Sequence, residues 1–189
     1  MSLKLITAAN ALAVDLASAK LHLRVDVADD DTLITAYITA ATEAAEQATG
    51  RAIMPQTWEL TLDAFPDAFE LTRVPAASVA SIKYIDTAGV EQTHASNQYT
   101  LNNADDFDCA YVVPAYSVTW PATRDQPNAV TVRFVAGYAN AAAVPESIKS
   151  WIKLQVGAMY ENRAAESDKQ GYPLGFADRL LDRYKVWKL

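Results

Sequence analysis

The 189-residue sequence has one cysteine, two histidines and six glycines, and each shortage excludes a class of protein. The lone Cys109 cannot form an intramolecular disulfide, which is usual for a reducing compartment. Zinc needs three or four nitrogen or sulfur ligands, but His22, His94 and Cys109 lie far apart in the sequence. The glycines form no GxGxxG or GxxxxGK loop, and no GxSxG motif is present. These absences argue against an enzyme.

Long apolar runs are also missing. No stretch approaches the roughly 18 consecutive apolar residues of a membrane-spanning helix. Residues 1–10 lack the apolar segment of a signal peptide, so we expect neither a leader nor a membrane partner. Apolar residues make up 51% of the chain and charged residues 21%, which is ordinary for a globular domain and argues against disorder.

Charge is distributed unevenly along the chain, whose net charge is −7. Residues 1–55 carry 4 basic and 7 acidic side chains, a net −3, and residues 56–144 carry 4 and 10, a net −6. Residues 145–189 carry 8 basic and 6 acidic side chains, a net +2. An acidic middle section repels phosphates and argues against tight DNA binding. The asymmetry either orients subunits head to tail or is only an uneven solvated surface.

Helical periodicity is confined to the two ends of the chain. The helices are predicted at about residues 16–25, 32–49, 145–163 and 176–187. Asp15 suits an N-cap, Gly50 suits a left-handed C-terminal cap, and Pro145 suits the first turn of a helix. The apolar stripe of the second helix is predicted to contain Ile34, Ile38, Ala41, Ala45 and Ala48.

Two acidic runs are candidates for cation binding. Asp29, Asp30 and Asp31 precede the second helix, where acidic side chains also cap a helix and interact with its dipole. The stretch 102–108 is rich in Asn and Asp, but its spacing does not match an EF-hand loop. We therefore expect a helix cap at the first run and a solvated turn at the second, and no metal or cofactor site.

The middle of the chain has the two-residue alternation of β-strands. Trp58, Leu60 and Leu62 alternate with polar residues, as do Val130, Val132 and Phe134. Shorter strands are expected at about residues 79–86, 90–94, 98–101 and 110–113. Several short strands separated by turns are typical of a small sandwich or barrel.

These patterns predict an α+β protein with an inserted sheet domain. Helices from residues 1–55 and 140–189 are expected to pack as one helical bundle. Residues 56–139 are expected to form a small antiparallel, sandwich-like β domain inserted between them.

Aromatic side chains are concentrated in the C-terminal helical section. Tryptophan, tyrosine and arginine are favoured anchors at protein interfaces, but the same side chains can fill the core between helices, and both alternatives stay open. The predicted subunit or partner interface consists of Tyr37, Trp151, Tyr160, Arg183, Tyr184 and Trp187. No catalytic residue is predicted.

A series of short motifs, in a fixed order along nearly the whole chain, resembles a known family. The motifs include Leu5-Ile6-Thr7, Leu23-Arg24-Val25, Thr49-Gly50-Arg51-Ala52, Gln56-Thr57-Trp58, Trp120-Pro121-Ala122-Thr123-Arg124, Ala136-Gly137-Tyr138, Val144-Pro145, Tyr160-Glu161-Asn162-Arg163 and Tyr184-Lys185-Val186-Trp187. This series resembles the head–tail connector family of tailed phages, often met in prophages as possible DNA-packaging proteins. Ala8-Ala9 and Lys185 depart from the family pattern, where prolines and an arginine are usual.

The resemblance implies a structural virion protein that forms a ring of about a dozen subunits. Such an adaptor sits under the portal protein, extends the DNA channel and offers a docking surface to head-completion or tail proteins. DNA passes through it without sequence-specific binding. The resemblance further implies a location in the virion, with assembly in the cytoplasm of a bacterial host, and implies neither a cofactor nor catalysis.

Other functions remain as alternatives. A tail-completion or tail-tube protein of the same virion would have more β structure and fewer flanking helices. A small glycan-binding or hydrolytic β-sandwich module would need a polar pocket with a perturbed titratable group. Direct DNA binding would produce retention on DNA that falls steeply with salt.

Overall fold

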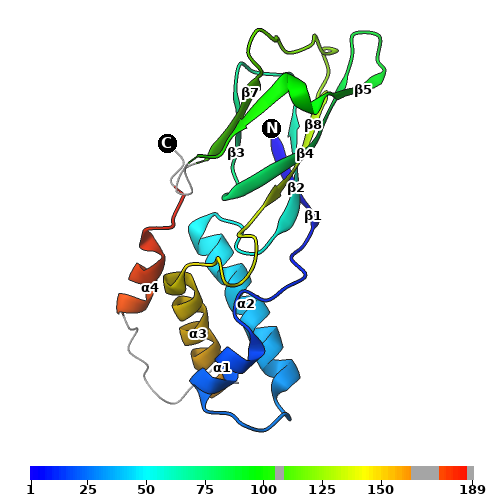
Figure 1. The fold of residues 1–189 in the computed structure, drawn as a ribbon. Coiled ribbons are helices and arrows are strands. Elements are labelled where there is room, and N and C mark those ends of the chain that lie inside the picture. Colours follow the sequence, from blue (N-terminus) through cyan, green and yellow to red (C-terminus); the bar gives the residue numbers. More distant parts are fainter. Residues whose placement is uncertain (105–108, 163–174, 187–189) are drawn as a thin grey trace. The chain divides into compact units, whose positions relative to one another are not determined.

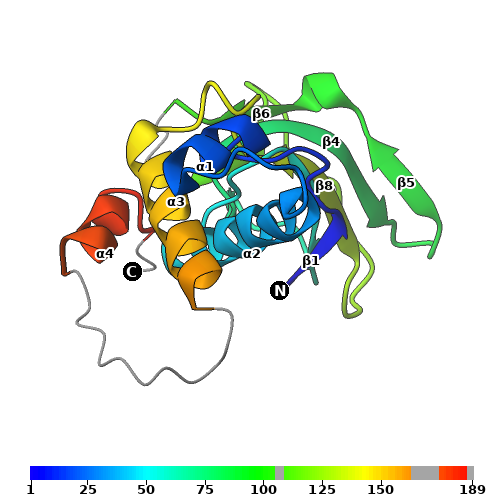
Figure 2. The same ribbon diagram turned by 90° about the horizontal axis from the view of Figure 1, so that it is seen from below.

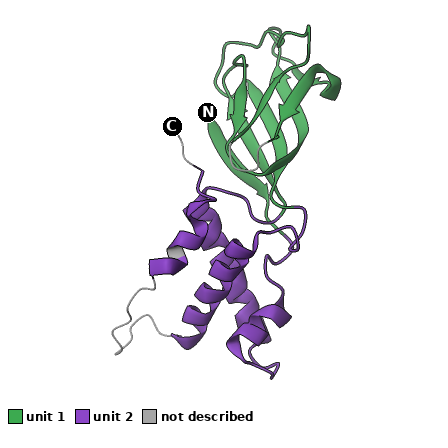
Figure 3. Ribbon diagram, turned by 60° about the vertical axis from the view of Figure 1, so that its left-hand side comes forward, with its two compact units in different colours: residues 1–9, 55–138 green, residues 10–54, 139–189 purple. Residues whose placement is uncertain are grey.

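The computed structural model describes residues 1–104, 109–162 and 175–186, and it divides into two compact units (Figure 1; Figure 3). One unit consists of residues 1–9 and 55–138 and contains the described β-strands. The other consists of residues 10–54 together with the chain from residue 139 and contains the described α-helices. The protein is therefore α+β, as the sequence predicts.

The β unit contains two antiparallel sheets. The five-stranded sheet has the order β1-β2-β8-β4-β5, and the three-stranded sheet has the order β3-β7-β6. The strands are β1 Ser2–Thr7, β2 Gln56–Leu62, β3 Phe69–Leu71, β4 Ala76–Ile85, β5 Glu91–His94, β6 Tyr99–Asn102, β7 Ala110–Pro114 and β8 Val130–Ala136. A short 3-10 helix, η1 Ser96–Gln98, precedes β6.

The core of the β unit is centred on β8, which lies between β2 and β4. Val132 on β8 is opposite Leu60 on β2 and Ile82 on β4, and all three side chains are fully buried. Phe134 occupies the same face two residues later and is also fully buried. The predicted alternation of β2 and β8 is thus confirmed, and it sets which face of this sheet is buried.

The N-terminal residues depart from the predicted division of the chain. Residues 2–7 were assigned to the helical section, but they form β1, an edge strand beside β2. Leu3 is opposite Leu60, and Leu5 is opposite Trp58. The segment is short, and its side chains are exposed or half-buried, so its apolar residues gave no clear contrast between a wet and a dry face.

The helical unit is formed by segments from both ends of the chain. Its helices are α1 Leu16–Leu23, α2 Asp31–Thr49, α3 Glu146–Glu161 and α4 Gly175–Asp182. α2 and α3 pack along each other, α1 contacts both, and α4 packs mainly on α3 (Figure 2). Their shared core contains Ile34, Ile38, Ala41 and Ala45 from α2 and Ile148, Trp151, Ile152 and Val156 from α3.

Helix boundaries follow the predicted capping residues. Asp15 caps α1 by accepting hydrogen bonds from the Ser18 backbone N–H at 2.8 Å and the Ser18 hydroxyl at 2.7 Å. Gly50 ends α2 with a φ of 74°, in the left-handed region that glycine adopts without strain. Two details differ: Ala48 is exposed, with Thr49 buried in its place, and α4 ends at Asp182 instead of residue 187.

None of the helices in the described segments combines the length and the apolar composition needed to cross a bilayer.

Candidate subunit interface

A buried arginine fastens the end of the described chain to the end of α2. Arg51 follows the C-terminal glycine of α2, and its side chain is 1% exposed. Its Nε donates to the Tyr184 carbonyl oxygen at 2.5 Å, and its guanidinium carbon lies 5.9 Å from the centroid of the Tyr184 ring. A buried guanidinium is tolerated only where hydrogen bonds replace its water, so this position depends on the Tyr184 backbone.

The contact continues through the main chain on either side of Arg51. The Val186 N–H donates to the Thr49 carbonyl at 2.8 Å, which satisfies one of the last carbonyl groups of α2. A Cβ at Gly50 would lie 3.6 Å from the Val186 Cβ, so the two segments are in van der Waals contact. Tyr184, a predicted interface residue, is thus half-buried within its own chain.

Sequence reasoning did not select Arg51, although the signal was present. The arginine stands between the cap glycine and the apolar run Ala52-Ile53-Met54, all three of which are buried. A charged side chain directly before a buried apolar run needs a polar partner if it is buried as well, and this pattern could have indicated that need.

The acidic run before α2 makes polar contacts within the chain. The Tyr160 hydroxyl on α3 donates to Asp30 Oδ2 at 2.6 Å, and Lys20 on α1 pairs with Asp31 Oδ1 at 2.5 Å. Asp30 occupies the N-cap position but makes no side-chain capping hydrogen bond, so the expected cap is only partly realised. In the described parts of the chain, no three His, Cys, Asp or Glu side chains are arranged to hold a metal ion.

The five predicted interface residues that lie in the described segments therefore separate into three groups. Trp151 is 6% exposed and belongs to the core of the helical unit, the second of the two alternatives left open above. Tyr160 and Tyr184 are half-buried and fasten α3 and the chain after α4 to other segments. Tyr37 is half-buried on α2, and Arg183 is exposed immediately after α4. Trp187 lies outside the described residues.

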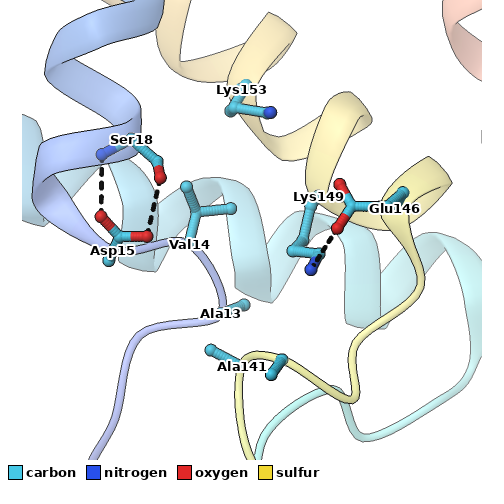
Figure 4. A pocket seen from close by; sticks show the side chains of 9 residues that line it. Ala13, Val14, Asp15, Ser18, Ala141, Glu146, Lys149 and Lys153 are labelled. Atoms are coloured by element: carbon cyan, nitrogen blue, oxygen red, sulfur yellow. Dashed lines mark hydrogen bonds and ion pairs between the residues drawn. The ribbon is translucent and has the colours of Figure 1, made fainter.

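A pocket of about 250 Å³ opens between the start of α1 and the first turns of α3 (Figure 4). Small apolar side chains form part of its wall, and its charged lining comes from Asp15, Glu146, Lys149 and Lys153. Lys149 Nζ pairs with Glu146 Oε1 at 2.5 Å. The hydrogen bond from Lys149 lowers the pKa of the Glu146 carboxyl, and the Ser18 backbone and side-chain bonds lower that of Asp15.

These shifts keep both carboxylates of the pocket ionised at neutral pH. General acid catalysis needs a carboxyl whose pKa is raised toward the working pH, which is the opposite of what Asp15 and Glu146 show. The lining contains no histidine or cysteine. The pocket is therefore suited to salt bridges and not to general acid catalysis by these two carboxyl groups.

Among the described residues of the β unit, His94 at the end of β5 is a buried titratable group. Its side chain is 6% exposed and lies among aromatic rings, with ring centroids 5.2 Å from Trp120, 6.1 Å from Phe65 and 6.2 Å from Tyr99. Desolvation lowers its pKa below the ordinary value, against a smaller opposite effect from the Gln98 backbone. The strand-end position agrees with the sequence prediction, but the burial was not predicted.

Comparison with known proteins identifies the class to which this fold belongs. Residues 13–111 match the family model of phage gp6-like head–tail connector proteins. This match covers more than half of the chain, and it confirms the family that the ordered motifs resemble. The chain belongs to this family of phage head–tail connector proteins.

Solved structures of similar chains come from gene transfer agent (GTA) particles. A chain in the neck of the empty GTA particle, computed with C6 symmetry, is 25% identical with a TM-score of 0.81. A chain in the virion of the native gene transfer agent particle is 26% identical, with a TM-score of 0.79. The neck of the native particle, computed with C12 symmetry, contains a chain 24% identical with a TM-score of 0.76, which shows the same fold. Each match covers 100% of this chain and 97% of the other. No curated protein sequence matches this chain.

Proposed function

We propose that this protein is a structural virion component that forms a ring of about a dozen subunits between the portal and the head-completion or tail proteins. Membership of the head–tail connector family carries this proposal. The related chains in GTA necks, computed with C6 and C12 symmetry, support a closed ring. In such a ring every subunit uses the same two complementary surfaces, related by a rotation that closes.

The helical unit is suited to provide these surfaces. Helices from both chain ends act as one bundle, because Arg51 and Tyr160 join segments more than 100 residues apart at 2.5 Å and 2.6 Å. A bundle fixed in this way keeps its outer faces at constant positions, which a repeated interface requires. Of the predicted residues, Tyr37 and Arg183 remain the candidates for direct contact, while Tyr160 and Tyr184 support the scaffold behind them.

The proposed ring extends the DNA channel and does not bind DNA in a sequence-specific way. The β unit carries 5 basic and 10 acidic side chains, a net charge of −5, which opposes adhesion to a phosphate backbone. The protein would reside in the virion and assemble in the cytoplasm of the bacterial host. Family membership favours this function over a tail-tube protein or a glycan-binding or hydrolytic module.

Native mass spectrometry and negative-stain microscopy test the proposal directly. The purified chain is examined alone over a range of concentrations and then with the portal protein encoded in the same genome. We expect closed rings in at least one of these conditions and co-migration of the ring with the portal. A chain that stays monomeric throughout and does not bind the portal would rule the proposal out.

A further inference from the structure

Helix α4 presents an exposed face that combines an aromatic ring with positive charge. Phe176 is 57% exposed, and Arg179 and Arg183 are exposed as well. Residues spaced by three lie on one side of a helix, so Phe176 and Arg179 share a side, and Arg183 follows directly after the last residue of α4. Leu181 is buried and anchors another side of α4 to the unit. An exposed phenylalanine beside arginines is typical of an interface anchor.

Helix α2 presents a face of complementary character. The buried residues of α2 face the unit, and the opposite side exposes Ala36, Thr39, Ala40, Glu43, Ala44 and Gln47. Alanine side chains leave a shallow apolar surface on which an aromatic ring can lie close to the helix. Glu43 adds a negative charge to that surface, and it makes no ion pair within the described residues.

The two faces belong to different sides of the helical unit. In two views at right angles, α3 lies between α4 and most of α2 (Figure 1; Figure 2). A face on one side cannot dock on the other within a single subunit, so each face needs a second molecule. Two complementary faces on different sides of one unit are the requirement for a head-to-tail contact between copies.

Rotational symmetry adds an independent reason to pair these two faces. In a ring, the helical units of all copies lie at the same height along the symmetry axis and at the same distance from it, and so do the β units. The helical unit of one copy therefore meets the helical unit of the next copy more readily than its β unit. Arg179 on α4 and Glu43 on the α2 face are oppositely charged, which favours this contact over a contact between two identical faces.

We propose that the α4 face of one subunit docks on the exposed face of α2 in the next subunit. Phe176 lies against the alanines of α2, and Arg179 pairs with Glu43. This inference rests on the proposed ring function and adds the partner surface, which is a second copy of this chain.

Charge reversal and its rescue test the pairing. Arg179→Glu is expected to raise the concentration needed for half-assembly about tenfold or more, since it opposes Glu43 with a second negative charge. Glu43→Arg in the same chain restores opposite charges and is expected to recover most of the assembly. Arg124→Glu changes an exposed arginine of the β unit in the same way; it is the control and leaves assembly unchanged. Rings that form equally well with Arg179→Glu would overturn the pairing.

The apolar part of the contact is tested with two exposed side chains. Phe176→Ala is expected to reduce ring formation about tenfold. Leu21→Ala is the matched control, because Leu21 is 82% exposed on α1 and belongs to neither of the two faces. Equal effects of the two substitutions would contradict the proposal, as would loss of portal binding by Phe176→Ala with ring formation intact.

Cross-linking distinguishes failure of this inference from failure of the ring. Glu43→Cys and Arg179→Cys are combined with Cys109→Ser, and a short thiol-to-thiol reagent is added to the assembled protein. A ladder of covalent multimers is expected, while a mixture of the two single-cysteine chains gives only dimers. Rings without a ladder would overturn the α2–α4 contact and leave the ring function standing. Absence of rings in every condition would rule out both the α2–α4 contact and the ring function.

Discussion

The β unit and the helical unit differ in how each one joins chain segments that are far apart in the sequence. In the β unit, segments far apart in sequence are joined by backbone ladders, as between β2 and β8, and the cross-strand ion pair Arg133–Glu59 lies at the surface. In the helical unit, distant segments are joined by buried or half-buried polar side chains. Arg51 holds the chain after α4, Tyr160 holds the turn before α2, and Lys20 joins α1 to Asp31.

The contrast follows from where each kind of element places its backbone hydrogen bonds. Strands form these bonds with neighbouring strands, so one ladder both satisfies the backbone and connects the chain over long distances. A helix satisfies its own backbone, so side-chain contacts must fix it to its neighbours. In this chain, about half of the helical unit comes from each end of the sequence, and polar side chains such as Arg51 and Tyr160 help to align the two halves.

Removing the Phe134 side chain from the centre of the five-stranded sheet should have the largest effect on stability. Phe134 is fully buried on β8, opposite Trp58 on β2 and Val79 on β4. Phe134→Ala is expected to lower the free energy of unfolding by about 3–5 kcal/mol, because it removes buried surface and leaves a cavity. Denaturant unfolding measures the change. Val135→Ala, half-buried on the same strand, is the control and should cost clearly less. Similar losses at both positions would show that the register of β8 does not define the core.

Removing the buried arginine should have the next largest effect. Arg51→Ala is expected to cost about 2–3 kcal/mol, because the Tyr184 carbonyl and the buried packing of the side chain are lost together. Hydrogen exchange should show faster exchange in α4 and at Val186, whose N–H is bonded to Thr49.

A surface arginine provides the matched control for this experiment. The Arg133 side chain is 53% exposed in its pair with Glu59, so Arg133→Ala should cost less than about 1 kcal/mol. If Arg51→Ala and Arg133→Ala were equally mild, polar contacts would not be what aligns the helical segments, and the contrast between the units would fail.

The same contrast explains what the sequence could predict. Periodicity located α2, α3, β2 and β8, because burial of one face follows directly from the order of apolar residues. Capping chemistry located Asp15 and Gly50, because these are local effects. Family motifs indicated the connector class, although they gave no geometry.

The polar links escaped prediction because they join residues far apart in sequence. The sequence around Arg51 does not identify Tyr184 as its partner, and the sequence around Tyr160 does not identify Asp30. β1 was missed for a related reason, since only its pairing with β2 makes Leu3 and Leu5 recognisable as part of a sheet. Of the interface candidates, an aromatic core residue such as Trp151 cannot be told from an anchor by composition alone.

Removing the Tyr160 hydroxyl should have a smaller effect on stability and tests a single polar contact of the helical unit. Tyr160→Phe removes the hydrogen bond to Asp30 Oδ2 and keeps the ring, so it should cost about 1–2 kcal/mol. Tyr116→Phe in the β unit is the control, since Tyr116 is 99% exposed and its hydroxyl is solvated. Thermal unfolding of the two variants side by side measures the difference. No difference between them would mean that the Tyr160 contact does not help to align α3 with the start of α2.

The smallest expected effect is a pH dependence that belongs to the β unit. His94 is buried among aromatic rings, and its pKa in the folded protein is lowered by desolvation. As pH falls through the ordinary value of about 6.5, the unfolded chain binds a proton at His94 that the folded chain does not. The unfolded state is therefore favoured, and the loss of stability continues until the pH reaches the lowered pKa of the folded state.

One proton can change the free energy of unfolding by at most about 1.4 kcal/mol per pH unit, so the slope has a ceiling. Denaturant unfolding between about pH 7 and pH 5.5 measures it before most carboxylates titrate. His94→Phe should reduce the change of unfolding free energy with pH. Phenylalanine fits among the surrounding aromatic rings and has no group that binds a proton. His22→Phe should leave the slope intact, since His22 is exposed on α1. A slope that survives in His94→Phe would place the titrating group elsewhere and would mean that burial of His94 contributes nothing to the pH response of the β unit.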